Sequence, residues 1–318
     1  MDSKLQRFCD DYLTNRAEIE KVFKIENGAV YPVCANIFLS HDQIADAEKL
    51  KECKKIISEN TSVFNFFRGN MQAPAASLMA CSSDPEGKLS QALEYYDILK
   101  KYFSSSEELV LASLMLTDMA RSSEISEIAE RSKVIYELMK KKHRFITGYE
   151  DSVFAVLLSL SDRNSEDMVY DMEKCFTALK GMTDKNNIQT IAQIFTMAGK
   201  PIEGMCSRFN ELFEAIRNAG MKYGKYNELP ILAALSANDT EIEQIVSDMS
   251  DVSEYLKDKK GYKGIFGADK RIRLRHSAML LNTYYSPSAE GDAVATASML
   301  AIIAFETMLM MSVTVNCI

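Results

Sequence analysis

The amino-acid sequence predicts an all-α protein, an α-solenoid (α/α superhelix) of about seven stacked helical hairpins with an extra N-terminal helix and an apolar C-terminal helix. Three observations predict this class. The 318 residues include only 13 glycines and 6 prolines, so few positions interrupt a helix. Short apolar segments centred on alanine recur along the chain, and a longer amphipathic segment follows each of them. The hydrophobic content of 47% is enough for a sizeable core.

The recurrence has a period of about 40 residues. Central alanines mark it with successive gaps of 41, 36, 43, 37, 41 and 45 residues, at Ala35, Ala76, Ala112, Ala155, Ala192, Ala233 and Ala278. Aliphatic residues of the longer segments repeat with gaps of 43, 39, 41, 37 and 40 residues, at Ile56, Leu99, Leu138, Leu179, Ile216 and Leu256. Two helical patterns within such a spacing are typical of stacked hairpins near the HEAT and armadillo range.

Hydrophobic periodicity identifies the segments as helices. In residues 242–256, apolar side chains fall at steps of 3, 4, 3 and 4, while Glu243, Asp248, Asp251 and Glu254 lie on the opposite face. The shorter segments, such as 153–160 and 188–198, are apolar nearly all round. We therefore expect each hairpin to pair a short buried helix with a longer helix that has one solvated face.

Prolines and capping residues indicate the helix boundaries, because proline is tolerated only in the first turn of a helix. Pro32, Pro74 and Pro230 precede the central alanine of a short helix, and Pro85, Pro201 and Pro287 precede or open a long one. N-cap candidates are Ser40, Asp84, Ser122 or Ser123, Asn164 or Ser165, and Asn238 or Asp239. We expect a first helix over 3–24 and a single domain over 1–318. Its hairpins should cover about 29–60, 61–103, 104–142, 149–181, 186–218, 226–260 and 268–313.

The stretch 293–311 contains a single charged residue, Glu306. Its large apolar side chains favour membrane insertion by about 2.7 kcal/mol together, and a central acidic residue opposes insertion by about the same amount. Its many Ala, Ser, Thr and Met residues favour a helix buried against other helices. We expect a buried cap or a surface for self-association, with membrane contact as the disfavoured alternative.

Composition restricts the partners and the chemistry. The formal net charge of −8 opposes a general electrostatic hold on nucleic acid or anionic lipid. The cysteines form no C-x-x-C pair, which suits free thiols in a reducing cytoplasm, and no signal peptide is expected. The three histidines are far apart, and the motifs of nucleotide-binding loops, zinc proteases and serine hydrolases are absent from the sequence. We therefore expect no metal, no cofactor and no catalytic residue that the sequence can identify.

The joints between consecutive hairpins carry the most distinctive strings, which read FFRGN (66–70), FITGYED (145–151), MKYGKY (221–226) and GYKGIFGAD (261–269). In this order, each before a short alanine-centred helix, they resemble a bacterial family known only as a domain of unknown function, DUF4003. The similarity runs over about residues 3–285. The resemblance implies a bacterial, all-helical, cytoplasmic protein and supplies no catalytic residue.

Two sets of candidate binding residues follow. In a hairpin solenoid the joints share one edge, so a row is expected from Arg68, Asn70, Thr147, Tyr149, Asp151, Tyr223 and Tyr262. Arg68 with Asn70 would read an anion or a carboxylate. The alternative is structural, with positive φ angles at Gly69, Gly148, Gly224 and Gly264 and aromatic side chains that staple the joints.

The second set is a basic stretch formed by Lys263, Lys270, Arg271, Arg273, Arg275 and His276. Arg271 and Arg275 share a helix face at a spacing of four residues, so they could hold a phosphate or an acidic peptide jointly. The alternative is a solvated helix face paired with nearby acids.

The sequence favours a protein- or peptide-binding helical-repeat module that acts through its inter-repeat edge or its concave face. This expectation is an analogy at the level of the fold class. An enzyme is disfavoured but stays open, as a closed α/α toroid with a carboxylate-lined cavity. A membrane-tethered scaffold that uses the C-terminal helix is the third possibility.

Overall fold

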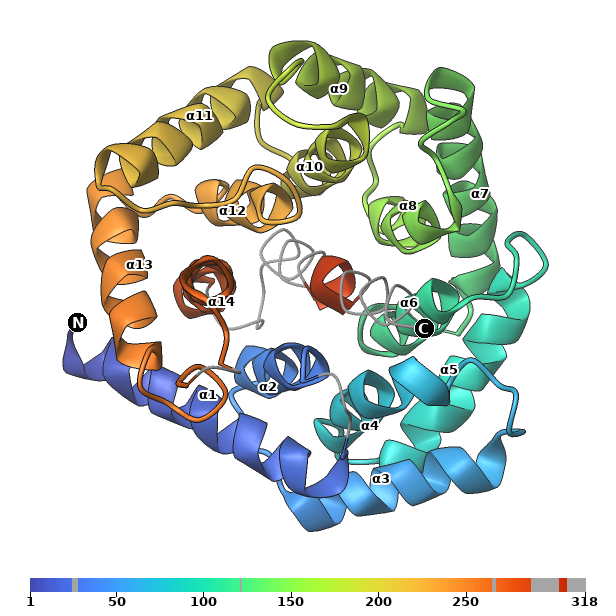
Figure 1. The fold of residues 1–318 in the computed structure, drawn as a ribbon. Coiled ribbons are helices and arrows are strands. Elements are labelled where there is room, and N and C mark those ends of the chain that lie inside the picture. Colours follow the sequence, from blue (N-terminus) through green and yellow to red (C-terminus); the bar gives the residue numbers. More distant parts are fainter. Residues whose placement is uncertain (25–27, 121, 265–266, 287–302, 308–318) are drawn as a thin grey trace. The chain divides into compact units, whose positions relative to one another are not determined.

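The structure is a computed structural model that describes residues 1–24, 28–120, 122–264, 267–286 and 303–307 (Figure 1). Within these ranges the backbone forms fourteen named α-helices, two 3-10 helices and no β-strand. The prediction of an all-α protein is confirmed for this part of the chain.

The helices follow one another with short connections. They are α1 (Ser3–Val22), α2 (Val30–Ser40), α3 (Ala47–Asn60), η1 (Gly69–Met71), α4 (Gln72–Ala80), α5 (Pro85–Leu99), α6 (Glu107–Met119), α7 (Ile125–Lys142), η2 (Tyr149–Asp151), α8 (Ser152–Ser159), α9 (Ser165–Ala178), α10 (Lys185–Ala198), α11 (Ile202–Asn218), α12 (Leu229–Ser236), α13 (Ile242–Leu256) and α14 (Lys270–Tyr285). Each of the expected ranges from 29–60 to 226–260 contains one short helix and one long helix.

Contacts between Cα atoms divide the chain into two compact units. Unit 1 contains residues 1–12 together with the described residues of 170–302. Unit 2 contains the described residues of 13–169 together with 303–307. The boundaries fall inside α1 and α9, and each unit is described here by itself.

In unit 2, short helices contact short helices and long helices contact long ones. Contacts join α2 to α4, α4 to α6 and α6 to α8, and a second series joins α3 to α5 and α5 to α7. Each long helix also packs against the short helix of the following hairpin, as in the pairs α3 and α4, α5 and α6, and α7 and α8 (Figure 1). The short helices are covered on several sides, which explains why their sequences are apolar nearly all round.

Unit 1 repeats this pattern of contacts. The short helices α10, α12 and α14 contact one another in order, and the long helices α11 and α13 contact each other. Helices α11 and α13 also pack against α12 and α14 respectively.

The central alanines lie in the short helices, which contact one another within each unit. All seven, from Ala35 in α2 to Ala278 in α14, are fully buried. The distance between packed helices depends on the side chains at the contact, about 8–10 Å between axes. A methyl side chain at a buried position of a short helix is compatible with a close approach of its neighbours.

The register of two long helices differs from the sequence prediction. Leu99, Leu179, Ile216 and Leu256 are buried as expected. In α3 and α7, however, Ile56 and Leu138 are only partly buried. The adjacent residues Ile57 and Met139 are buried in their place. One residue rotates the side chain by about 100° around the helix axis, so the pattern alone does not separate two neighbouring apolar residues.

The N-cap predictions are right at two helices and wrong at three. Asp84 accepts a hydrogen bond from Gly87 N (2.9 Å), and Asn164 accepts one from Glu166 N (2.8 Å). Asp46, rather than Ser40, caps α3. Helices α7 and α13 begin at Ile125 and Ile242, beyond the expected Ser122 or Ser123 and Asn238 or Asp239, without a side-chain cap.

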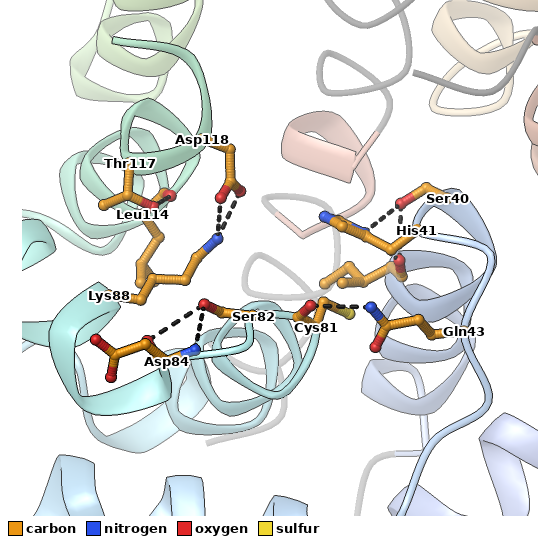
Figure 2. A network of polar contacts seen from close by, with 11 residues as sticks. Ser40, His41, Gln43, Cys81, Ser82, Asp84, Lys88, Leu114, Thr117 and Asp118 are labelled. Carbon is orange, nitrogen blue, oxygen red and sulfur yellow. Dashed lines mark hydrogen bonds and ion pairs between the residues drawn. The ribbon is translucent and has the colours of Figure 1, made fainter. Parts of the chain in front are cut away.

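The loops that connect the two helices of one hairpin, here called turn loops, are tied to the neighbouring hairpin by polar side chains. In unit 2, Gln43 Nε2 donates to Cys81 O (2.9 Å), and Lys88 Nζ lies 2.5 Å from both carboxylate oxygens of Asp118 (Figure 2). In unit 1, Arg208 Nε donates to Ser236 O (3.0 Å). Gln43 and Arg208 thereby satisfy carbonyl groups at the C-terminal ends of α4 and α12, which have no partner within the helix.

The long helices carry these cations at a spacing close to that of the repeat. Lys49, Lys88, Arg131, Lys174 and Arg208 are separated by 39, 43, 43 and 34 residues. Lys49 and Arg131 each donate to a carbonyl oxygen of the next turn loop, those of Ser82 and Arg163. Lys174 lies 3.7 Å from the carboxylate of Glu203. Sequence analysis missed this series, although the sequence has a lysine or arginine in each long helix at nearly the same interval.

The first half of α1 belongs to unit 1 and packs against its last hairpins. Tyr12 Oη lies 2.7 Å from Tyr262 Oη in the loop before α14. Phe8 makes an edge-to-face contact with Tyr284, with ring centroids 5.4 Å apart. Hydrogen bonding and aromatic packing thus join the first helix of the chain to α14 and the loop that precedes it.

The expectation for the C-terminal stretch 293–311 falls mostly outside the described residues. Residues 303–307 are helical and buried, including the side chain of Glu306. Among the helices that the structure describes, none combines the length and the apolar character needed to cross a membrane.

Candidate functional site

The loops between consecutive hairpins, here called joint loops, carry most of the residues singled out in the sequence. Unit 2 holds Arg68, Asn70, Thr147, Tyr149 and Asp151, and unit 1 holds Tyr223, Tyr262, Arg271 and Arg275. Some of these residues are buried or hydrogen-bonded within a joint loop and stabilise it, whereas others are exposed to solvent.

Arg68 ties a joint together. Its Nε donates to Thr61 Oγ1 (3.0 Å), and its NH2 group donates to the carbonyl oxygens of Ser58 and Thr61. These carbonyls lie at the C-terminal end of α3, where backbone acceptors have no helical partner. The contacts favour a structural role for Arg68 over the expected role of reading an anion.

Asn70 lies beside a pair of acids at the start of α6. Its side chain makes a hydrogen bond to Glu107. Burial raises the pKa of the Glu107 carboxyl, and the neighbouring charge of Glu108 adds to the rise. Burial also raises the pKa of Glu108, to which the charge of Glu150 contributes. Glu108 therefore lies close enough to Glu107 and to Glu150 for their charges to interact, and Asn70 lies beside Glu107.

The joint before α8 is held by Asp151 and Thr147, which are both buried. Asp151 Oδ2 accepts a hydrogen bond from Gly148 N (2.8 Å). The expected positive φ angles occur at Gly69 and Gly264 but not at Gly148, where φ is −116°. Asp151 instead satisfies the Gly148 amide in an extended conformation. Gly224 is likewise outside the positive-φ glycines.

Exposed aromatic side chains lie on two joint loops of unit 2, the one between α3 and α4 and the one between α7 and α8. Phe64 is 95% exposed, Phe145 96% and Tyr149 65%, and Phe66 is also exposed. The charges of Glu108, Glu150 and Glu107 help to raise the pKa of Tyr149 after burial, so this phenol lies close to the acids of α6 and η2. Sequence analysis selected Tyr149 but missed Phe64 and Phe145. An aromatic residue within a short polar segment between two helices could have identified them in the sequence.

The two tyrosines of unit 1 are buried and support the fold. Tyr223 Oη donates to Glu228 O (2.9 Å). Tyr262 Oη lies 2.7 Å from His276 Nδ1 as well as from the hydroxyl of Tyr12. Both side chains staple a joint, as the structural alternative proposed.

The two arginines of the basic stretch contact different partners. Arg271 forms an ion pair with Glu228, whose side chain is buried. Arg275 NH2 lies 3.4 Å from His276 Nε2. The shared helix face therefore does not bring Arg271 and Arg275 to one ligand, because Glu228 occupies the guanidinium of Arg271.

Two thiols of unit 2 lie away from the joint loops, in α2 and directly after α4. Burial raises the pKa of Cys34 and of Cys81 to about 12, so these thiols stay protonated at neutral pH. The described part of the chain contains no group of three His, Cys, Asp or Glu residues that could hold a metal ion. The joint loops of unit 2 instead combine exposed aromatic rings with acids, a composition suited to non-covalent binding.

Replacement of Glu108 by glutamine is expected to stabilise the protein at pH 7.5 and to have little effect near pH 4. Burial raises the pKa of Glu108 in the folded state, so its ionised form weakens the fold above that pKa. As the pH falls through the raised pKa, the carboxyl takes up a proton and this cost disappears. Urea unfolding midpoints at both pH values measure the effect, and Glu52→Gln on the exposed face of α3 is the control. Equal midpoint shifts at both pH values would contradict the assignment.

Comparison with known proteins gives one match. The model of a family described as "Protein of unknown function (DUF4003)" matches residues 15–308. No curated protein and no solved structure matches the chain.

Proposed function

Because the chain belongs to the DUF4003 family of proteins of unknown function, we propose its function from its own geometry. It is a helical-repeat module that binds a partner protein through the joint loops of unit 2. The partner contributes a segment with apolar side chains and with lysine or arginine.

The observation that supports this proposal is the exposure of Phe64, Phe66, Phe145 and Tyr149 on the joint loops. An aromatic side chain buries about 150–250 Å² when it is covered, and aromatic residues supply much of the binding energy at protein interfaces. These loops are therefore the part of unit 2 with the most to gain from a partner.

The acids beside Tyr149 indicate the charge of the partner. Glu107 and Glu108 are partly removed from water, and Glu150 lies near enough to raise the pKa of Glu108. A lysine or arginine of the partner would offset the lost solvation and the mutual repulsion of these carboxylates.

The proposed scaffold is an α-solenoid in which successive hairpins present successive joint loops. Packed helices lie about 8–10 Å apart, and a peptide in the polyproline II conformation advances about 3.1 Å per residue with three residues per turn. Side chains three residues apart in such a peptide would reach neighbouring joints. The contacts from α4 to α6 and from α6 to α8 support this spacing.

Selection of random displayed peptides on the intact chain tests the proposal. We expect enriched peptides to combine Lys or Arg with large apolar residues. In fluorescence anisotropy, the double variant Phe145→Ser and Tyr149→Ser should bind them at least about 30-fold more weakly, since two aromatic anchors contribute about 1 kcal/mol or more each.

The matched control is Ile44→Ser, which removes an exposed apolar side chain from a turn loop of the same unit. Its affinity should stay within about twofold of the unmodified chain, within the ordinary effect of a surface substitution. An unchanged affinity of the Phe145 and Tyr149 variant, or a selection without enriched peptides, would contradict the proposal.

A further inference from the structure

A pocket of about 270 Å³ lies in unit 1, where α13 ends and α14 begins. Three cationic side chains line it, those of Lys257, Lys270 and Arg273, with one carboxylate, that of Glu254. Lys270 and Arg273 are three residues apart in the first turn of α14, so they share a face of the helix. Lys257 is the residue that follows α13.

The charges in this pocket interact strongly. The hydrogen bond from Lys257, followed by its charge, lowers the pKa of Glu254, and Arg273 and Lys270 contribute to the effect. Lys257 Nζ lies 2.8 Å from the Glu254 carboxylate. One of the three cations is therefore paired, and two positive charges remain at the pocket.

Lys270 and Arg273 have few partners of their own. Within the described residues, Lys270 makes no ion pair, and the side chain of Arg273 donates one hydrogen bond, from NH1 to Ala268 O (3.1 Å). The buried Nε of Arg273 has no acceptor there. A guanidinium carries five N–H donors, so Arg273 keeps unused capacity for an anion.

The start of α14 carries several cations and one capping carboxylate, that of Asp269, whose Oδ1 accepts a hydrogen bond from Ile272 N (2.8 Å). The first turn of α14 contains Lys270, Arg271 and Arg273 and no acidic residue. The N-terminus of a helix carries the positive end of its dipole, which repels cations and attracts anions. Asp269 offsets part of this repulsion, and an anion in the pocket would offset more of it.

Two serine hydroxyls complete the pocket, those of Ser250 and Ser253 on α13. Ser253 is only 5% exposed, and within the described residues its side chain has no hydrogen-bond partner. The Ser253 hydroxyl is therefore available to donate a hydrogen bond to a ligand in the pocket. Met221 and Leu274 form the apolar part of the wall.

We propose that this pocket binds a phosphate group, free or as a small phosphomonoester. Lys270 and Arg273 compensate its two negative charges, Ser253 donates a hydrogen bond, and Lys257 stays anchored by Glu254. The volume of about 270 Å³ lies just below the range of about 300–1,000 Å³ typical of small-molecule sites, which favours a small ligand. Bidentate donors and ammonium groups are the usual partners of phosphate in proteins.

Calorimetric titration of the intact chain with inorganic phosphate at low ionic strength tests the proposal. We expect saturable binding with one site per chain, at least tenfold weaker in Lys270→Met and in Ser253→Ala. The matched control is Lys263→Met, which removes a charge from the same basic stretch at an exposed position outside the pocket. Its affinity should stay within twofold of the unmodified chain.

A parallel titration with glycerol phosphate distinguishes the two sources of the group. Tighter binding than that of inorganic phosphate assigns the pocket to an esterified phosphate, and equal binding assigns it to the free ion. Circular dichroism before each titration shows that the variants are folded. The absence of saturable binding up to 10 mM, equal losses in Lys263→Met and Lys270→Met, or an unchanged affinity of Lys270→Met would overturn the proposal.

Discussion

Replacement of Phe209 by alanine should lower the free energy of unfolding by about 3–5 kcal/mol. Phe209 is fully buried in α11. Its ring meets that of Phe195 in α10 edge to face, with centroids 6.1 Å apart. Truncation removes this contact and the apolar area of the ring, and it leaves a cavity between the two helices of one hairpin. Urea unfolding followed by circular dichroism at 222 nm measures the loss.

Phe145→Ala is the matched control, because the same atoms are removed from a side chain that is 96% exposed. It should change the free energy of unfolding by no more than about 0.5 kcal/mol. Phe209→Leu should fall between the two, since it keeps most of the apolar volume. A loss for Phe209→Ala that is no larger than that of the control would show that α10 and α11 do not pack as described.

The helices could be predicted from the sequence because a period of apolar residues is a local signal that tertiary contacts reinforce. Residues 242–256, taken from the sequence as one amphipathic helix, are α13 as observed. Most of the central alanines were identifiable for the same reason, since they stand inside a largely apolar helix, whereas Ala278 stands in α14, which carries Lys270, Arg271, Arg273 and Arg275. The two compact units, by contrast, depend on contacts between distant residues, which periodicity does not report.

The first residue of a helix was less predictable where the preceding turn loop accepts hydrogen bonds from a neighbouring hairpin. Helix α13 begins at Ile242, after the expected caps Asn238 and Asp239. The reason is visible in the loop, where the carbonyl oxygens of Ser236, Asn238 and Thr240 accept hydrogen bonds from Arg208 in α11. These hydrogen bonds hold the loop in a non-helical conformation, so the helix does not begin at Asn238 or Asp239 although both residues favour an N-cap position.

The site residues show the same limit. The sequence located the joints correctly as places of interest, but it could not tell Tyr262, which is buried against Tyr12 and His276, from Tyr149, which is exposed. In the basic stretch, the spacing of four residues correctly placed Arg271 and Arg275 on one helix, α14. The buried acid that occupies Arg271, Glu228, lies 43 residues earlier, and the cations of this stretch that line the pocket of unit 1 are Lys270 and Arg273.

Replacement of Asp118 by alanine should lower the free energy of unfolding by about 2–4 kcal/mol, whereas Lys88→Met should be nearly neutral. Lys88 extends from α5 with a side chain that is only 5% exposed, and Asp118 at the end of α6 is 47% exposed (Figure 2). Removal of the acid leaves a buried ammonium without its counter-charge, which is more costly than the pair itself is stabilising. The expected loss is smaller than that for a fully buried ion pair, because Asp118 is partly exposed and water can reach the ammonium group of Lys88 from that side.

Methionine in place of Lys88 keeps the length of the side chain and removes the charge, so Asp118 can turn to solvent. The double variant Lys88→Met and Asp118→Ala should therefore recover most of the stability that Asp118→Ala alone loses, and the difference measures the coupling between the two groups. Urea unfolding of the three variants tests this, with Glu127→Ala on the exposed face of α7 as the control. A double variant no more stable than Asp118→Ala would show that the loss comes from the backbone at the end of α6 and not from the unpaired ammonium of Lys88.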